Sequence, residues 1–198
     1  MIKELELSVN DPIVQFANEI AYTVPNIKEN GWHKKFVCVS TNEDYIKSFS
    51  SNRNNEFIAN DKLFDIIQNV INIMSNNGFN HDFVNINLNK VNVELHYANS
   101  NDGNYIYPWS APHQDNDIGT RVNTFICYFD TSCEGGELAI YDSDEKTMLS
   151  KIDTLPVSTG SQILNKKIII FSGDIVHNPL KIINGHRYAI SFHIPIFN

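Results

Sequence analysis

The sequence predicts an α+β protein that is mainly β, with helices in its first 80 residues and strands from residue 84 onward. Two observations predict this class. Segments with helix-start and helix-stop signals fall in the N-terminal part, whereas short runs of alternating apolar and polar side chains follow one another in the C-terminal part. With 198 residues and no repeat or linker, the chain is expected to form a single domain over residues 1–198.

The N-terminal part is expected to hold three helices, each marked by a start or stop signal. Asn10-Asp11-Pro12 supplies a capping side chain and then a proline in the first turn. Thr41-Asn42-Glu43-Asp44 has the form of a second cap, and Asn77-Gly78 ends the longest helix. The expected elements are helices at 13–23, 41–49 and 60–74, with a short strand at 35–39.

The C-terminal part is expected to form the sheets. The expected strands span 84–88, 91–95, 122–130, 137–142, 146–152, 167–172, 175–183 and 187–196, with a bulge or tight turn at 89–90. Along the last strand, Arg187 shares a face with polar Ser191, while apolar side chains take the other face. Such alternation fits a β-sandwich with a polar site on the inner face and helices against the outer face.

His113, Asp115 and His177 form a candidate metal site. Residues i and i+2 of a strand project from the same face, so His113 and Asp115 can hold one ion while Gln114 points away. Two imidazoles and one carboxylate hold iron(II) on one face and leave its other positions open. His177 would return from far along the chain as the third ligand. The His-x-Asp pair alone is a weak signal, because it also arises by chance.

Arg187 adds a second chemical feature. Its planar guanidinium suits a carboxylate, which it can bind with two parallel hydrogen bonds. A metal site combined with an acid-binding cation predicts an oxygenase that consumes a keto acid.

Two further motifs carry a family resemblance. Glu134-Gly135-Gly136-Glu137-Leu138 lies between the metal-ligand candidates, and Arg187-Tyr188-Ala189-Ile190 begins the last strand. With these motifs, residues 97–196 resemble the catalytic core of the iron(II)/2-oxoglutarate dioxygenases of the prolyl 4-hydroxylase type, including the oxygen-sensing prolyl hydroxylases. The resemblance implies a double-stranded β-helix (jelly-roll, cupin-like) over residues 84–198, supported by helices within residues 1–80.

The resemblance also implies roles for individual residues. His113, Asp115 and His177 would be the catalytic iron ligands, and Arg187 would hold the distal carboxylate of 2-oxoglutarate. The other matches line the co-substrate site, with Tyr128 on the same carboxylate, Tyr97 as a second tyrosine and Leu138 as an apolar wall. The implied cofactors are iron(II), 2-oxoglutarate and O2, with ascorbate as a supporting reductant. Asp115 favours hydroxylation, because related halogenases lack this carboxylate.

The substrate is expected to enter beside the loop at 99–110. Tyr105, Tyr107 and Trp109 offer flat apolar surface for a proline ring or a peptide backbone. Covering the rim of the barrel is an equally good interpretation of these three side chains. The leading function is hydroxylation of a prolyl or other amino-acid residue in a peptide or protein. The open alternatives are a hydroxylase of a free amino acid or small metabolite, a cupin-like metal enzyme without 2-oxoglutarate, and a catalytically silent binding module.

Composition limits the partners and the compartment. The net charge of −8 argues against nonspecific binding to nucleic acid or to an anionic membrane surface. No apolar run reaches membrane-spanning length and the first ten residues lack a signal-peptide core, so a cytoplasmic protein is expected. The three cysteines are expected to be reduced thiols. The oligomeric state stays open.

Two other histidines are predicted to lie outside the site. His96 has the opposite strand parity to Tyr97 and is expected to face away. His193 shares a face with Arg187 but lies about 20 Å along the strand at ~3.3 Å per residue, too far to ligate the same ion.

Overall fold

The computed structural model describes residues 1–23, 37–39, 56–58, 62–79, 91–100, 111–116, 120–155 and 165–196. The helices are α1 (Pro12–Thr23) and α3 (Leu63–Asn76). The strands are β1 (Ile2–Ser8), β2 (Val37–Val39), β3 (Glu56–Ile58), β4 (Asn92–Asn99), β5 (Arg121–Gly135), β6 (Leu138–Tyr141), β7 (Met148–Ile152), β8 (Asn165–Ser172), β9 (His177–Pro179) and β10 (Ile182–Ile196). In these residues, no helix combines the length and apolar character needed to cross a membrane.

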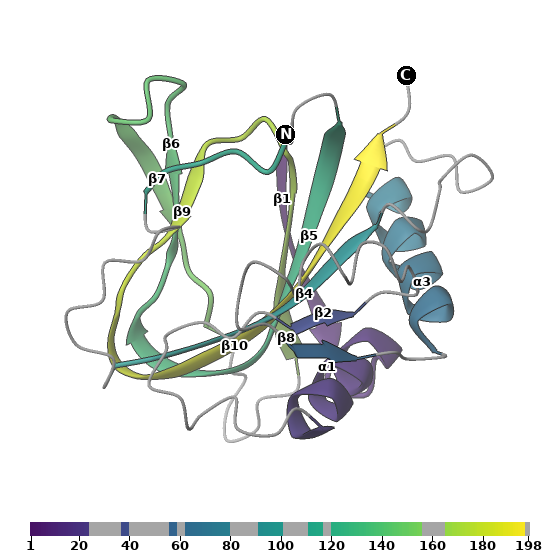
Figure 1. Ribbon diagram of the computed structural model, residues 1–198. Helices are drawn as coiled ribbons and strands as arrows, with labels where there is room; N and C mark the ends of the chain where they lie inside the picture. Colours follow the sequence, from purple (N-terminus) through teal and green to yellow (C-terminus); the bar gives the residue numbers. More distant parts are fainter. Residues whose placement is uncertain are drawn as a thin grey trace.

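The strands form two sheets in a mainly β molecule (Figure 1). The larger sheet has the order β1-β8-β5-β10-β4-β2-β3, and the smaller has the order β7-β6-β9. Neighbouring strands are antiparallel, apart from the short parallel pair β2–β3. In Figure 1 the smaller sheet lies on one side of the larger sheet and both helices lie on the other. The finer description as a double-stranded β-helix stays a prediction.

Two apolar clusters hold these layers together. Between the helices and the larger sheet, α3 buries a stripe made of Leu63, Ile66, Ile67, Val70, Ile71 and Met74. β10 meets this cluster with Tyr188, Ile190, Phe192 and Ile194. The second cluster lies between the two sheets and includes Tyr128, Leu138, Phe171 and Ala189. The alternation predicted for β10 is therefore confirmed, because its apolar even-numbered residues face the helices and Ala189 faces the smaller sheet.

Several predicted elements are confirmed with shifted ends. The helices expected at 13–23 and 60–74 begin at Pro12 and Leu63. The strand expected at 175–183 is two strands, because the chain leaves the smaller sheet after Pro179 and enters the larger one at Ile182. The expected helix at 41–49, the strand at 84–88 and the aromatic residues Tyr105, Tyr107 and Trp109 lie outside the described residues.

Sequence reasoning missed β1, which extends the larger sheet at one edge. Charged residues interrupt its apolar pattern and most of its side chains are exposed, so the alternation that marks a half-buried strand is weak. β1 forms because it pairs with β8, a partner that is distant in the sequence. Lys167 Nζ lies 2.5 Å from Glu4 Oε2, and Asn165 Nδ2 donates to Glu6 Oε2 at 2.9 Å. The region expected to be helical support thus also contributes strands.

Candidate metal centre

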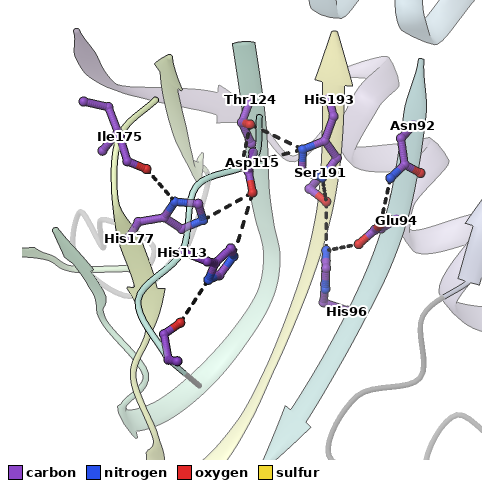
Figure 2. Close-up of polar contacts among 11 residues, drawn as sticks. Asn92, Glu94, His96, His113, Asp115, Thr124, Ile175, His177, Ser191 and His193 are labelled. Carbon is purple, nitrogen blue, oxygen red and sulfur yellow. Dashed lines mark hydrogen bonds and ion pairs between the residues drawn. The ribbon is translucent and has the colours of Figure 1, made fainter. Parts of the chain in front are cut away.

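The structure brings His113, Asp115 and His177 together, as Figure 2 shows. One ligand atom from each residue lies within 4.8 Å of the others. His177 begins β9, and its backbone pairs with His113: the His113 amide donates to the His177 carbonyl at 3.0 Å, and the His177 amide donates back at 2.9 Å. The Asp115 amide donates to the Gly173 carbonyl at 3.0 Å. Backbone pairing therefore places His177 beside His113 and Asp115, although His177 lies far along the sequence from them.

Both histidines are oriented for coordination through the same ring atom. His113 Nδ1 lies 3.1 Å from the Ala111 carbonyl oxygen, and His177 Nδ1 lies 3.1 Å from that of Ile175. A carbonyl only accepts, so each Nδ1 carries the proton and each Nε2 keeps its lone pair. Asp115 Oδ1 lies 3.8 Å from His113 Nε2 and 3.6 Å from His177 Nε2. These three atoms fit the two-histidine, one-carboxylate set that binds iron(II).

The protonation states also suit a metal. Burial opposes ionisation of Asp115, but the facing histidines and the Thr124 hydroxyl outweigh it, so the pKa of Asp115 is lowered. Burial lowers the pKa of His177, although the Asp115 charge acts in the opposite direction. An ionised carboxylate and a neutral imidazole are the forms that bind metals, because a ligand atom must first lose its proton.

Arg187, Tyr128 and Leu138 also lie together. The Arg187 Cζ atom is 5.6 Å from the centre of the Tyr128 ring, and the guanidinium donates to the Gly136 carbonyl. Tyr128 and Leu138 belong to the cluster between the sheets. Burial raises the pKa of Tyr128 to about 12 despite the Arg187 charge, so its phenol stays protonated and can donate. No described carboxylate forms an ion pair with Arg187.

Thr131 joins this group, and sequence reasoning missed it. It lies directly opposite Arg187 in the β5–β10 register, and its buried Oγ1 has no hydrogen-bond partner among the described residues. Plain alternation would put Thr131 on the outer face with Phe129. The register shifts beside Tyr188, however, and this bulge brings both Tyr128 and Thr131 to the inner face. A bulge adds one residue to a strand without leaving a mark in the apolar pattern.

The candidate metal centre and the Arg187 group lie against the same apolar cluster between the sheets. Phe171, in the cluster that contains Tyr128 and Leu138, lies against the ring of His177 with a centroid separation of 4.7 Å. The negative charge of Asp115 also reaches Tyr128, where it helps to raise the pKa of the phenol.

Tyr97 does not join this group, although the resemblance places it in the co-substrate site. It pairs with Tyr188 in the β4–β10 register, with ring centroids 4.6 Å apart. Both side chains belong to the cluster on the helix side of the larger sheet. Strand parity explains the difference, because Tyr97 continues the buried series of Val93 and Leu95.

His96 and His193 were expected to lie outside the site, but the structure places both on the inner face of the sheet. His96 Nε2 lies 2.8 Å from Ser191 Oγ, on the inner face of the sheet. His193 Nδ1 lies 3.6 Å from Asp115 Oδ2. His193 was expected to lie far from the metal because it lies far from Arg187 along β10. Asp115, however, contacts β10 at His193, so distance from Arg187 does not measure distance from the candidate ligands.

Comparisons with known proteins bear on the fold. No protein-family model and no curated protein sequence matches the chain. The structure is similar to a truncated collagen prolyl hydroxylase of Paramecium bursaria Chlorella virus-1, with 16% identity, 98% of this chain and 90% of that chain covered, and a TM-score of 0.50. It is also similar to IDO from Bacillus thuringiensis, with 15% identity, 98% and 93% coverage, and a TM-score of 0.50.

A third similar structure is a prolyl hydroxylase from Trichoplax adhaerens in complex with a hypoxia-inducible factor peptide fragment. It has 16% identity, covers 98% of this chain and 83% of that chain, and has a TM-score of 0.49. The resemblance to the prolyl 4-hydroxylase type that the motifs predict is confirmed at the level of the fold.

Proposed function

We propose that the chain is an iron(II)- and 2-oxoglutarate-dependent dioxygenase that hydroxylates an unactivated C–H bond. One observation carries this proposal. A His–Asp–His set whose Nε2 atoms face the Asp115 carboxylate lies against the same inter-sheet cluster as a guanidinium without a described carboxylate partner. We also propose that residues 1–198 form one catalytic domain whose core, residues 84–198, is a double-stranded β-helix.

The residues present fit the metal. His113 Nε2, His177 Nε2 and Asp115 Oδ1 would hold iron(II) on one face. The bound metal would supply the activation of O2 that couples decarboxylation of 2-oxoglutarate to C–H hydroxylation. The overall reaction converts substrate, O2 and 2-oxoglutarate into hydroxylated substrate, succinate and carbon dioxide. The work of the protein is to position the reactants and to keep water away from them.

The residues present also fit the co-substrate. Arg187 would hold the distal carboxylate of 2-oxoglutarate with two parallel hydrogen bonds. Tyr128 adds a protonated phenol, and Thr131 adds a buried hydroxyl that finds no partner in the part of the chain that the structure describes. One carboxylate of a dicarboxylic acid would accept a hydrogen bond from this hydroxyl and also neutralise the charge of the guanidinium. Leu138, fully buried beside Tyr128, would form the apolar wall against its methylene groups.

We further propose that the acceptor is a prolyl or other amino-acid residue in a peptide or protein. The support is the chain's fold, shared with a collagen prolyl hydroxylase, together with the aromatic residues Tyr105, Tyr107 and Trp109 of the expected entrance loop. A free amino acid carries charges at both ends and would need charged partners at the entrance. A substrate panel separates these acceptors.

The test is succinate release by the purified chain with iron(II), O2 and 2-oxoglutarate, measured against proline-containing peptides and free amino acids. We expect release above the uncoupled background with at least one peptide, and loss of release when 2-oxoglutarate is omitted. The matched control is Asp115→Asn, which keeps the side-chain shape but removes the charged ligand. If the metal-loaded protein neither binds 2-oxoglutarate in calorimetry nor releases succinate, the proposal fails.

A further inference from the structure

A line of polar side chains runs from Asp115 across three strands of the larger sheet (Figure 2). Thr124 Oγ1 on β5 lies 2.5 Å from Asp115 Oδ2 and 3.4 Å from His193 Nδ1 on β10. Ser191 Oγ, also on β10, lies 3.2 Å from His193 Nε2. His96 Nε2 on β4 lies 2.8 Å from the same Ser191 oxygen. The line therefore connects a metal ligand to a residue two strands away.

The carboxylate fixes the direction of the first hydrogen bond, and the other directions follow when His193 and His96 carry one ring proton each. An ionised carboxylate only accepts, so the Thr124 hydroxyl must donate to Asp115. Thr124 has no second proton to give, so His193 Nδ1–H donates to Thr124. An imidazole with one proton then has a bare Nε2, which accepts from the Ser191 hydroxyl. Ser191 in turn accepts from His96 Nε2–H. In this arrangement all the hydrogen bonds of the line run toward Asp115.

This direction assigns different tasks to the two oxygens of Asp115. Oδ2 is taken by Thr124, whereas Oδ1 faces the Nε2 atoms of His113 and His177. Thr124 is fully buried and Ser191 is 2% exposed, so little water is available to replace a missing partner. The orientation of the carboxylate therefore depends on side chains of the sheet interior.

We propose that Thr124, His193, Ser191 and His96 form a positioning relay that sets the orientation of Asp115 and thereby the metal affinity of the site. The inference rests on the proposed function, because it takes Asp115 as a metal ligand. It goes further by giving a role to Ser191 and His96, which do not contact the ligand. Removing the Ser191 hydroxyl leaves His193 Nε2 without its hydrogen-bond donor and removes the preference of His193 for one tautomer. The hydrogen bonds that orient Thr124 and Asp115 are weakened as a result.

The experiment measures the affinity of the apo-protein for Co(II) alone, by calorimetry and by the visible absorption of the bound ion. Loss of an outer partner of a ligand typically costs about 10–100-fold in metal affinity. We expect Thr124→Val to fall within that range and Ser191→Ala to lose roughly tenfold, near its lower end. Thr124→Ser keeps the hydroxyl and should restore an affinity close to that of the wild type.

A matched control separates the relay from general loss of buried hydrogen bonds. Thr154 is 1% exposed and donates to the Gly136 carbonyl at 3.1 Å, outside the relay. Thr154→Val should therefore keep the wild-type Co(II) affinity and the wild-type absorption spectrum. Thermal melting of each apo-variant shows whether it is folded. If Ser191→Ala is unfolded, His193→Phe is measured in its place, because it removes the next member of the relay, between Ser191 and Thr124, with a ring of similar shape.

The double variant Thr124→Val/Ser191→Ala tests whether the residues act as one unit. Once Thr124 is absent, a relay predicts little further loss from Ser191→Ala, whereas independent effects would add. Folded Ser191→Ala with wild-type Co(II) affinity overturns the relay, and so do additive losses. Failure of the wild-type protein to bind Co(II) would instead count against the metal site of the proposed function.

Discussion

Replacing Arg187 with alanine should separate binding of the co-substrate from binding of the metal. In the proposed complex, the change leaves one carboxylate of 2-oxoglutarate without its charged partner between the two sheets. Truncating one member of a buried, hydrogen-bonded charge pair costs about 2–5 kcal/mol. Tyr128 and Thr131 remain as neutral donors beside the carboxylate, so the lower part of this range is expected. At 1.4 kcal/mol per tenfold change, a loss of about 2–4 kcal/mol weakens affinity by roughly 30-fold to 1,000-fold.

The assay is calorimetric titration of 2-oxoglutarate into the Co(II)-loaded protein, with Co(II) affinity measured separately. Co(II) affinity should stay near the wild-type value, because Arg187 is not one of the three residues grouped around the metal position. Arg187→Lys should fall between the wild type and Arg187→Ala, because lysine keeps the charge but loses the planar fork. Since Arg187 also donates to the Gly136 carbonyl, thermal melting must show that the variant is folded. Unchanged 2-oxoglutarate affinity in folded Arg187→Ala would refute the assignment.

Three further predictions concern the other groups of the site. Alanine at any one of the three candidate ligands, His113, Asp115 or His177, should abolish succinate release and lower Co(II) affinity. Circular dichroism should show that each variant stays folded. Full activity in His177→Ala would contradict the metal site. Tyr128→Phe and Thr131→Val should each weaken 2-oxoglutarate binding by about 0.5–1.5 kcal/mol in calorimetry, the usual net value of one hydrogen bond; no change in either would leave Arg187 as the sole anchor. Trp109→Ala should slow hydroxylation of the acceptor but spare uncoupled decarboxylation of 2-oxoglutarate, and an equal loss of both would point to a structural role.

The candidate metal ligands were predictable because residue types and spacing alone mark them in the sequence. His113-x-Asp115 and His177 have the residue types of an iron site, and a backbone bridge brings them together as the motif predicts. The faces of β10 were also predictable from alternation, since Ile190 and Phe192 lie in the helix-side cluster.

The remaining site residues depend on strand register, which no local pattern specifies. Thr131 reaches Arg187 only through a bulge, and His193 meets Asp115 because Asp115 contacts Thr124, the register partner of His193 on β5. Tyr97 shows the opposite error. Its own alternation with Val93 and Leu95 predicts the buried outer face, and the family resemblance led to the wrong side of the strand.

The three candidate ligands belong to different layers of the sandwich. His177 begins β9 of the smaller sheet, whereas Asp115 is anchored through Thr124 to β5 of the larger sheet. An ion bound between them would cross-link the two layers and close a loop of chain that runs from residue 113 to residue 177. Removing the ion should then loosen this edge, because hydrogen bonds such as those between His113 and His177 and from Asp115 to Gly173 would hold it without the metal. Amide hydrogen exchange at His113 and His177 should therefore slow when Co(II) is added. The metal would then stabilise the fold locally as well as take part in the chemistry.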